Sequence, residues 1–325
     1  MGNRTSGRAP KTQRKNRELT ISLKKPPKVL LIGNGLCMAL EQKGFGDILW
    51  DICNKNRNDL EKEEFKRLSL PFPQKVIVAT SDQVNTNMNY LAKGLREIKL
   101  SPENREYVLG LIRNADVDAI LTTNYSYEIE NTLYESYNKS SYIEHRRHTK
   151  KEIDESLPDQ LHQFIDLSDV GIAAPLWHIH GEAYRPNSMV MGQYYYGRLL
   201  GYIRDELQNF FIRKGMAEKA GKTTMAVHSW VDYFLLGDVH ILGFGLDPSE
   251  MDLWWLINFK KMRFNSTSVW YHNLKMDREE EGKYHLMKAC GIQFDEDMEV
   301  LFRDAHREQS EYSYRDYYLK VIDSL

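Results

Sequence analysis

The sequence predicts an α/β fold in which a Rossmann-like parallel sheet carries helices on both faces. Four short apolar runs each end in glycine or small polar residues, and a helical pattern follows; they begin near Val29, Val117, Ala174 and Val239. The first run, over residues 29–32, contains no polar alternation, which is typical of a strand covered on both sides. Strands that alternate with helices in this way indicate a parallel sheet.

The elements follow one another in a consistent order. Residues 28–40 predict a buried strand, a glycine turn and the start of a helix, and the pattern over about 41–115 is helical, with a break at Pro71 and Pro73. Residues 139–169 are rich in charge and poor in apolar periodicity, so we expect a loop there. The segment after residue 188 predicts a short strand and then a long amphipathic helix. Residues 267–273 predict a late strand, with a helical region after it.

The charge distribution divides the chain into two parts. Residues 1–28 hold nine lysines and arginines against one glutamate, whereas the whole chain has a net charge of −2. We expect residues 1–28 to form a basic, disordered arm, and residues 29–325 to form one domain with insertions at about 41–115 and 129–174. The alternative for the arm is docking to nucleic acid or to an acidic partner.

Composition restricts the class of protein. No apolar run reaches the length of a membrane span, and no apolar segment follows the basic start, so we expect no membrane association and no secretory signal. The three cysteines, Cys37, Cys53 and Cys290, are far apart and form no C-x-x-C pair. This argues against a disulfide framework and a zinc module, and favours a cytoplasmic protein.

The predicted strand ends hold the residues with chemical potential, because ligands bind at the carboxyl ends of parallel strands. Gly33, Asn34 and Gly35 could approach a phosphate at a helix start, although a plain tight turn explains them equally well. Thr123 and Asn124 end the next strand. The Asn124 amide could hold a ribose hydroxyl or a water, and helix capping is the alternative.

Two later predicted strand ends hold a candidate general base and a turn that could bind a nucleotide. His180 could act as a general base near neutral pH, and strand geometry would place His178 on the same face as His180. The alternative is a structural histidine. No cysteine or third histidine stands at ligand spacing, and Glu182 is the nearest carboxylate, so we expect no metal. Gly243, Phe244, Gly245 and Asp247 could seat an adenosine, or simply form a β-to-α turn.

The series GNG, TTNY, HG and GFGLD, in this order, resembles the sirtuin-like NAD-binding domains, in particular the bacterial branch of anti-phage defence. The resemblance runs from about residue 28 to 273, with gaps at 41–115 and 129–174. It implies that Asn124 and His180 are catalytic, that Gly33 and Gly35 approach the NAD pyrophosphate, and that Gly243, Gly245 and Asp247 form the adenosine-ribose corner. Asn34, Cys37, Ser126 and the pair Phe244-Gly245 depart from the family pattern.

The resemblance implies an NAD+ hydrolase, because the zinc module of the deacetylase branch is absent from this sequence. NAD would be the substrate, split into nicotinamide and ADP-ribose without a metal. It also implies abortive infection through NAD depletion, gated by a sensor protein encoded nearby, with homo-oligomers formed. The alternatives are a non-catalytic NAD or ADP-ribose sensor, another nucleotide hydrolase or zinc-free deacylase, and a nucleic-acid-binding protein led by the arm. The sequence identifies neither the trigger nor the partner.

Overall fold

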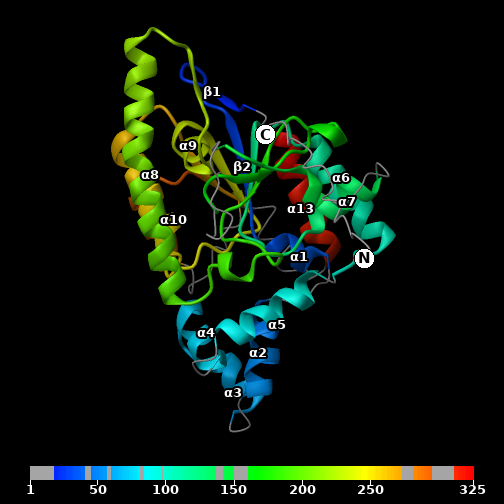
Figure 1. Cartoon of the computed structure of the whole chain (residues 1–325). Coiled ribbons are helices and arrows are strands. Elements are labelled where there is room, and N and C mark those ends of the chain that lie inside the picture. The colour runs from blue at the N-terminus through cyan, green and yellow to red at the C-terminus, as the bar shows by residue number, and fades with distance from the viewer. Residues whose placement is uncertain are drawn as a thin grey trace, which may run out of the picture.

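The computed structural model describes residues 18–40, 45–56, 60–80, 84–96, 98–136, 142–149, 160–272, 281–294 and 311–325. These residues form an α/β unit built on a seven-stranded sheet with helices on both sides, which confirms the predicted fold class (Figure 1). Among the described residues, none of the helices combines the length and apolar character that crossing a membrane would need.

The large sheet has the strand order β4-β5-β6-β3-β2-β8-β9. Its strands are β4 (Arg146–His148), β5 (Gln163–Ile165), β6 (Leu176–His178), β3 (Ala119–Thr122), β2 (Lys28–Ile32), β8 (Asp238–Leu242) and β9 (Val269–Tyr271). The five strands from β6 to β9 run parallel, and β5 and β4 extend that edge antiparallel. A separate antiparallel pair joins β1 (Thr20–Ser22) to β7 (Thr224–Ala226).

Successive residues of the central strands pack on opposite sides of the sheet. In β2, Leu30 and Ile32 join one apolar core, whereas Val29 and Leu31 join the other. Both sets are fully buried, which explains why this strand shows no polar alternation.

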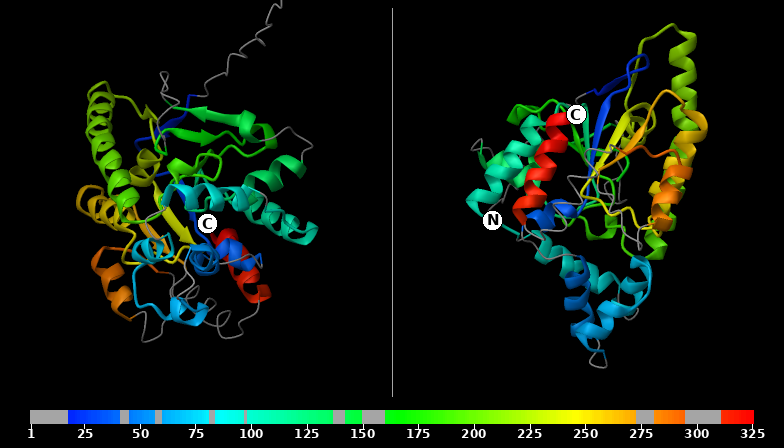
Figure 2. Two further views of the ribbon diagram at one scale, coloured as in Figure 1. Left: turned by 60° about the horizontal axis from the view of Figure 1, so that its bottom comes forward. Right: turned by 180° about the vertical axis from the view of Figure 1, so that it is seen from behind.

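The first core lies under α1 (Gly35–Ala39), α6 (Pro102–Asn114), α7 (Glu128–Ser136) and α13 (Glu311–Ser324). The second core lies under α8 (Gln193–Lys219), α9 (Trp230–Leu236), α10 (Met251–Arg263) and α11 (Glu281–Ala289). Short 3₁₀ turns are η1 (Tyr142–His145), η2 (Ser168–Val170) and η3 (Pro186–Ser188). The two further views show the α8 side and the α13 side flanking the sheet (Figure 2).

A helical module stands beyond one end of the sheet. It consists of α2 (Phe45–Asn56), α3 (Lys62–Arg67), α4 (Phe72–Thr80) and α5 (Val84–Arg96), shown in blue and cyan at the bottom of Figure 1. Its helices pack on one another, whereas α6 packs on α7 and α13 at the side of the sheet. The expected insertion at 41–115 therefore has two parts: α2 to α5 form the helical module, whereas α6 packs at the side of the sheet as part of the core.

Three expectations about secondary structure are corrected. The region 139–169, expected to be a loop, supplies β4 and β5, because two short strands can pair on a sheet edge without an apolar run. No strand precedes α8, where η3 and coil lie instead. Residues 20–22 of the expected arm form β1, whereas residues 1–17 lie outside the described residues.

Candidate functional site

The glycine turn after β2 is packed closely against the turn after β8. The Gly33 N–H donates to the Leu242 carbonyl at 3.0 Å, and the Gly35 N–H donates to the Gly243 carbonyl at 2.5 Å. A Cβ on Gly33 would lie 2.5 Å from the Cα of Phe244, so this approach requires glycine. The two N–H groups that a phosphate would need are thus used within the fold.

Asn124 lies at the end of β3 and ties this strand end to the glycine turn. Its side-chain amide donates to the Gly33 carbonyl and to Cys37 Sγ, both at 3.3 Å, and its backbone N–H donates to Thr122 Oγ1 at 3.1 Å. The side-chain Oδ1 is buried and accepts no hydrogen bond from the described residues. This amide makes no capping hydrogen bond to α7 among the described residues, so Oδ1 remains as an acceptor for a bound molecule.

A pocket of about 470 Å³ opens beside Asn124, between the strand ends and the helical module. Such a volume is typical of small-molecule sites, which combine an apolar wall with a few polar groups. Its lining consists of Asn34, Cys37, Asn124, Tyr125 and Ser126 from the strand ends, and Ile48, Asp51, Ile52, Tyr90, Leu91, Lys93, Gly94, Leu95 and Ile98 from the helical module and the residues after it. Two separate parts of the chain therefore form one site.

A buried carboxyl lies behind the polar wall of this pocket. Ser126 Oγ donates to Glu128 Oε2 at 2.8 Å, and Glu128 Oε1 has no hydrogen-bond partner among the described residues. Burial raises the pKa of Glu128, and burial together with the Glu128 charge raises the pKa of the Cys37 thiol. Cys37 therefore stays a neutral thiol, which argues against a nucleophilic role.

The two histidines of the third strand end do not share a face, which corrects the expectation from strand periodicity. β6 ends at His178, and His180 lies in the turn that follows. His178 faces Glu130 of α7, whereas His180 faces Asp252 of α10 on the other side of the sheet. The period of two holds only while the strand continues.

His178 is held as part of the fold. Its Nδ1 lies 2.7 Å from the Asn124 carbonyl oxygen and its Nε2 lies 2.5 Å from Glu130 Oε1, so both ring nitrogens face acceptors. Burial alone would lower the pKa of His178, but the Glu130 charge raises it above its ordinary value. The ring thus fits a buried cation that fixes the backbone of Asn124.

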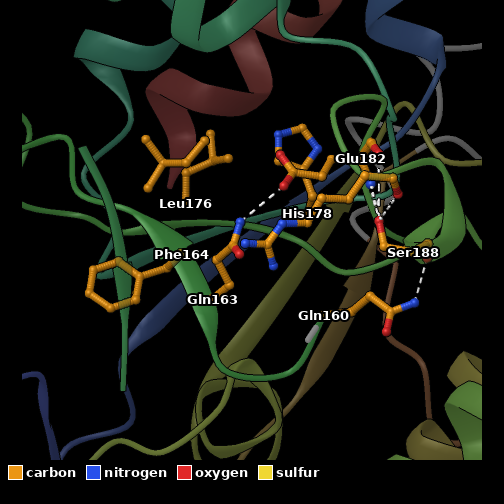
Figure 3. Close-up of a pocket in the computed structure, with 10 residues that line it drawn as sticks. Gln160, Gln163, Phe164, Leu176, His178, Glu182 and Ser188 are labelled. Atoms are coloured by element: carbon orange, nitrogen blue, oxygen red, sulfur yellow. Dashed lines mark hydrogen bonds between the residues drawn. The ribbon is translucent and has the colours of Figure 1, made fainter. Parts of the chain in front are cut away.

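A small cavity of about 20 Å³, lined by both polar and apolar side chains, lies next to His178 (Figure 3). Gln163 Nε2 donates to Glu182 Oε1 at 3.0 Å across this space, and Arg146 pairs with Glu182 Oε2 at 2.6 Å. The cavity suffices for about one water molecule. It is too small for a substrate, so the larger pocket beside Asn124 is the candidate site.

His180 belongs to a buried acidic cluster. Its Nε2 lies 3.0 Å from Asp252 Oδ2, and Tyr196 donates from its hydroxyl to Glu250 Oε2 at 2.7 Å. Burial alone would lower the pKa of His180, but Asp252 and Glu250 raise it above its ordinary value. Burial raises the pKa of Glu250 to about 7. A histidine and a carboxyl group, both with raised pKa values, therefore lie together.

The reason for expecting no metal is corrected by this cluster. His180, Glu250 and Asp252 each offer a ligand atom, and these atoms lie within 4.8 Å of one another. Histidine and carboxylates are suitable ligands for several divalent ions. Glu182 is the only nearby carboxylate in the sequence, because Glu250 and Asp252, at the start of α10, lie about 70 residues further along the chain.

The remaining predicted residues occupy three different positions. Asn34 lines the pocket, whereas Thr123 is buried and donates its N–H to the Ile32 carbonyl at 3.1 Å. Phe244 packs edge-on against His180 with ring centroids 6.4 Å apart. Gly245 and Asp247 are exposed on the following turn.

Asp247 organises that turn, as the simpler alternative predicted. Asp247 Oδ1 accepts from the Ser249 N–H at 2.8 Å and from the Ser249 hydroxyl at 2.5 Å. Asp247 also lines a second, more open hollow of about 660 Å³ that the start of α4 and α10 share. Of the expected adenosine corner, Asp247 therefore lines a different hollow from the pocket beside Asn124.

The buried acids near the strand ends were not predicted from the sequence, and none of them lines the pocket beside Asn124. Glu128, Glu250 and Asp252 were missed, as was the wall from the helical module. Residues 250 and 252 lie shortly after the predicted strand end at residues 243–247, and this position could have indicated that they lie near the other strand ends. Comparison of the chain with family models and with curated proteins gives no match, so the assignment of function depends on this geometry.

Proposed function

We propose that the chain is an NAD+ glycohydrolase that releases nicotinamide and ADP-ribose. The observation that carries the proposal is the free, buried Oδ1 of Asn124 at the wall of a pocket of about 470 Å³. The apolar side chains of α2 and α5 suit a planar base, and the polar strand-end groups suit a sugar. The order of the strand-end motifs, which resembles the sirtuin-like domains, selects NAD among molecules of this kind.

Asn124 would orient the ribose and one water molecule. Nicotinamide leaves as a neutral base when the bond to ribose C1 breaks, so the leaving group needs no proton. The water then forms the new bond to C1, and its proton passes to His180. The His180 side chain is only 3 % exposed and does not line this pocket, so the proposed proton transfer requires that NAD binding open a path from the water to the ring.

A second function has a specific observation in its favour. The His180 ring is buried and does not line the pocket beside Asn124, as expected for a protein that binds NAD or ADP-ribose without turnover. Such a sensor would use the same pocket. Binding of NAD without nicotinamide release would favour it.

The deciding experiment is nicotinamide release from NAD by the purified full chain. We expect Asn124→Ala to lower the rate roughly 10² to 10⁴-fold, as loss of a positioned catalytic group usually does. Asn265→Ala, at an exposed asparagine after α10, is the matched control and should keep the wild-type rate. Each protein is assayed alone and with the product of the neighbouring gene, because the proposal includes gating by a partner in anti-phage defence.

The outcomes separate the alternatives. Release by the wild type that Asn124→Ala abolishes would support both the activity and the site. Release that Asn124→Ala leaves unchanged would contradict the assignment of Asn124. No release by the wild type under either condition, with NAD still bound in calorimetry, would replace the hydrolase by the sensor.

A further inference from the structure

The backbone of Asn124 is tied to the end of the neighbouring strand. β3 and β6 pair in parallel, and their last residues, Thr122 and His178, lie opposite one another. The Ile179 N–H continues the pairing by donating to the Thr122 carbonyl at 2.9 Å. This register brings His178 Nδ1 to 2.7 Å from the Asn124 carbonyl oxygen. The contact between this ring and Asn124 thus follows from the pairing of two central strands.

Every polar group of Asn124 except one has a partner within the fold. The backbone N–H donates to Thr122 Oγ1, and the carbonyl oxygen lies against His178. The side-chain amide donates to the Gly33 carbonyl and to Cys37 Sγ. The side-chain Oδ1 is the exception, since it is buried and accepts no hydrogen bond from the described residues. The direction of Oδ1 consequently depends on how firmly the rest of the residue is held.

Glu130 of α7 holds the far side of the His178 ring. Glu130 Oε1 lies 2.5 Å from His178 Nε2, and the two side chains are 2 % and 6 % exposed. Tyr127 packs edge-on against the same ring, with 5.4 Å between centroids and an interplanar angle of 61°. Rotation of the imidazole would break both of its hydrogen bonds in a buried place, which is costly because no water replaces them. The ring is therefore a rigid support.

The position of one hydrogen on this ring follows from its partners. The carbonyl oxygen of Asn124 can only accept, so Nδ1 of His178 must carry a hydrogen. This is true whether the second hydrogen of the pair lies on Nε2 or on Glu130. The contact with Asn124 is thus independent of the charge of the ring.

We propose that His178, held by Glu130, is the positioning residue for Asn124, and that its Nδ1–H fixes the Asn124 backbone so that Oδ1 is directed at the ribose and the water. The inference rests on the proposed hydrolase function. His178 and Glu130 do not line the pocket beside Asn124, so both act through the asparagine. A displacement of about 1 Å in a group that orients a substrate can lower a rate about 10²-fold.

Two replacements of His178 separate the Nδ1 contact from loss of the ring as such. An asparagine side chain can place an amide N–H close to the position of Nδ1, whereas glutamine reaches toward the position of Nε2 and Glu130. We expect His178→Gln to lower kcat for nicotinamide release roughly 10 to 10²-fold. KM for NAD should change little, because the lining of the pocket is intact. His178→Asn should retain most of the wild-type kcat.

His162→Gln is the matched control. His162 is also buried, its Nδ1 lies 2.6 Å from the His228 carbonyl oxygen, and its Nε2 lies 3.9 Å from Glu206. It does not line the pocket beside Asn124. We expect His162→Gln to lower the free energy of unfolding and to leave kcat unchanged. The same pattern in folded His178→Gln would show a purely structural histidine and overturn the proposal.

A measurement without turnover tests the contact itself. Nitrogen NMR of the full chain labelled in its histidine rings, with His178→Gln to assign the signal, shows which ring nitrogens carry hydrogen. We expect a hydrogen on Nδ1 of His178 in the wild type. An Nδ1 without hydrogen would overturn the proposal, as would equal losses of kcat in folded His178→Gln and His178→Asn.

A second pair of variants applies if His178→Gln does not fold. Glu130→Gln keeps a polar partner for His178 Nε2, whereas Glu130→Leu removes it. We expect only Glu130→Leu to lower kcat, again with little change in KM. Equal kcat values in the two folded proteins would contradict the role of Glu130 as the support of the ring. Assignment of the NMR signal then uses His178→Asn.

The outcomes separate this inference from its foundation. If the wild type releases no nicotinamide, the hydrolase proposal fails and the positioning role fails with it. If the wild type releases nicotinamide, Asn124→Ala abolishes the release and His178→Gln keeps the wild-type kcat, the hydrolase proposal stands and this inference alone fails. Loss of kcat in His178→Gln with recovery in His178→Asn would support both.

Discussion

Replacement of Glu250 by glutamine should stabilise the protein above neutral pH and leave it unchanged in acid. Glu250 is 8 % exposed, and burial raises its pKa from 4.5 to about 7. The folded state therefore keeps a proton that the unfolded chain releases from pH 4.5 upward. Stability from this group is fully present below pH 4.5 and is lost as the pH rises to about 7.

The size of the effect follows from the same shift. Because burial raises the pKa from 4.5 to about 7, and each tenfold change in proton affinity is worth about 1.4 kcal/mol, ionised Glu250 costs up to about 3.5 kcal/mol of unfolding free energy well above pH 7. Glu250→Gln is neutral at every pH and can still accept the Tyr196 hydroxyl, which donates to Glu250 at 2.7 Å. We therefore expect a gain of up to about 3 kcal/mol at pH 8 and almost none at pH 4.5.

The assay is urea unfolding of the full chain, in the presence of a chelator, at several pH values from 4.5 to 8.5. Glu206→Gln is the control, because Glu206 is also buried but pairs with Arg213 at 2.9 Å. Loss of that pair should lower stability at pH 8, by about 1 to 3 kcal/mol. A Glu250→Gln curve that runs parallel to the wild type over the whole range would refute the reasoning.

Two further predictions concern the fold. Gly181→Ala should lower the free energy of unfolding by about 2 kcal/mol or more, because Gly181 has φ +87° and a Cβ would clash with the Ser188 carbonyl. Gly197→Ala, with open space around it in α8, should raise the free energy of unfolding by about 0.5 to 1 kcal/mol. Equal melting temperatures of the two variants would contradict this. Burial lowers the pKa of Lys260 to about 7. Between about pH 7 and 10 the unfolded chain holds a proton on Lys260 that the folded chain has lost. The free energy of unfolding of the wild type should therefore rise with pH relative to that of Lys260→Met. Parallel dependences of the two proteins on pH would contradict this.

Much of the fold could be predicted because its determinants are local. The apolar runs of β2, β3 and β8, each followed by a polar or glycine turn, identify buried parallel strands without any knowledge of their neighbours. The edge strands β4 and β5 were missed, since three-residue strands carry too few positions for a period of two to be visible. Their pairing depends on the neighbouring edge of β6 rather than on their own sequence.

The candidate site was predicted in part. Asn124 at the end of β3 follows from chain order, because parallel strands present their carboxyl ends together. The sequence did not predict that His178 and His180 face opposite sides of the sheet. The strand ends at His178, and the turn that follows directs His180 toward Asp252 instead of Glu130. The roles of Asn124 and His180 in NAD hydrolysis stay predictions until nicotinamide release is measured.

The sequence by itself determined the α/β class, the order of the strand ends and the close glycine turn, because each depends on residues adjacent in the chain. Only the tertiary structure decided that α2 and α5 form the second wall of the pocket and that Asp252 faces His180. The physical reason is that burial and charge compensation act between side chains that the fold brings together, whatever their separation in sequence. A strand end can be recognised locally, but its partners are set by the packing of α10 against the sheet.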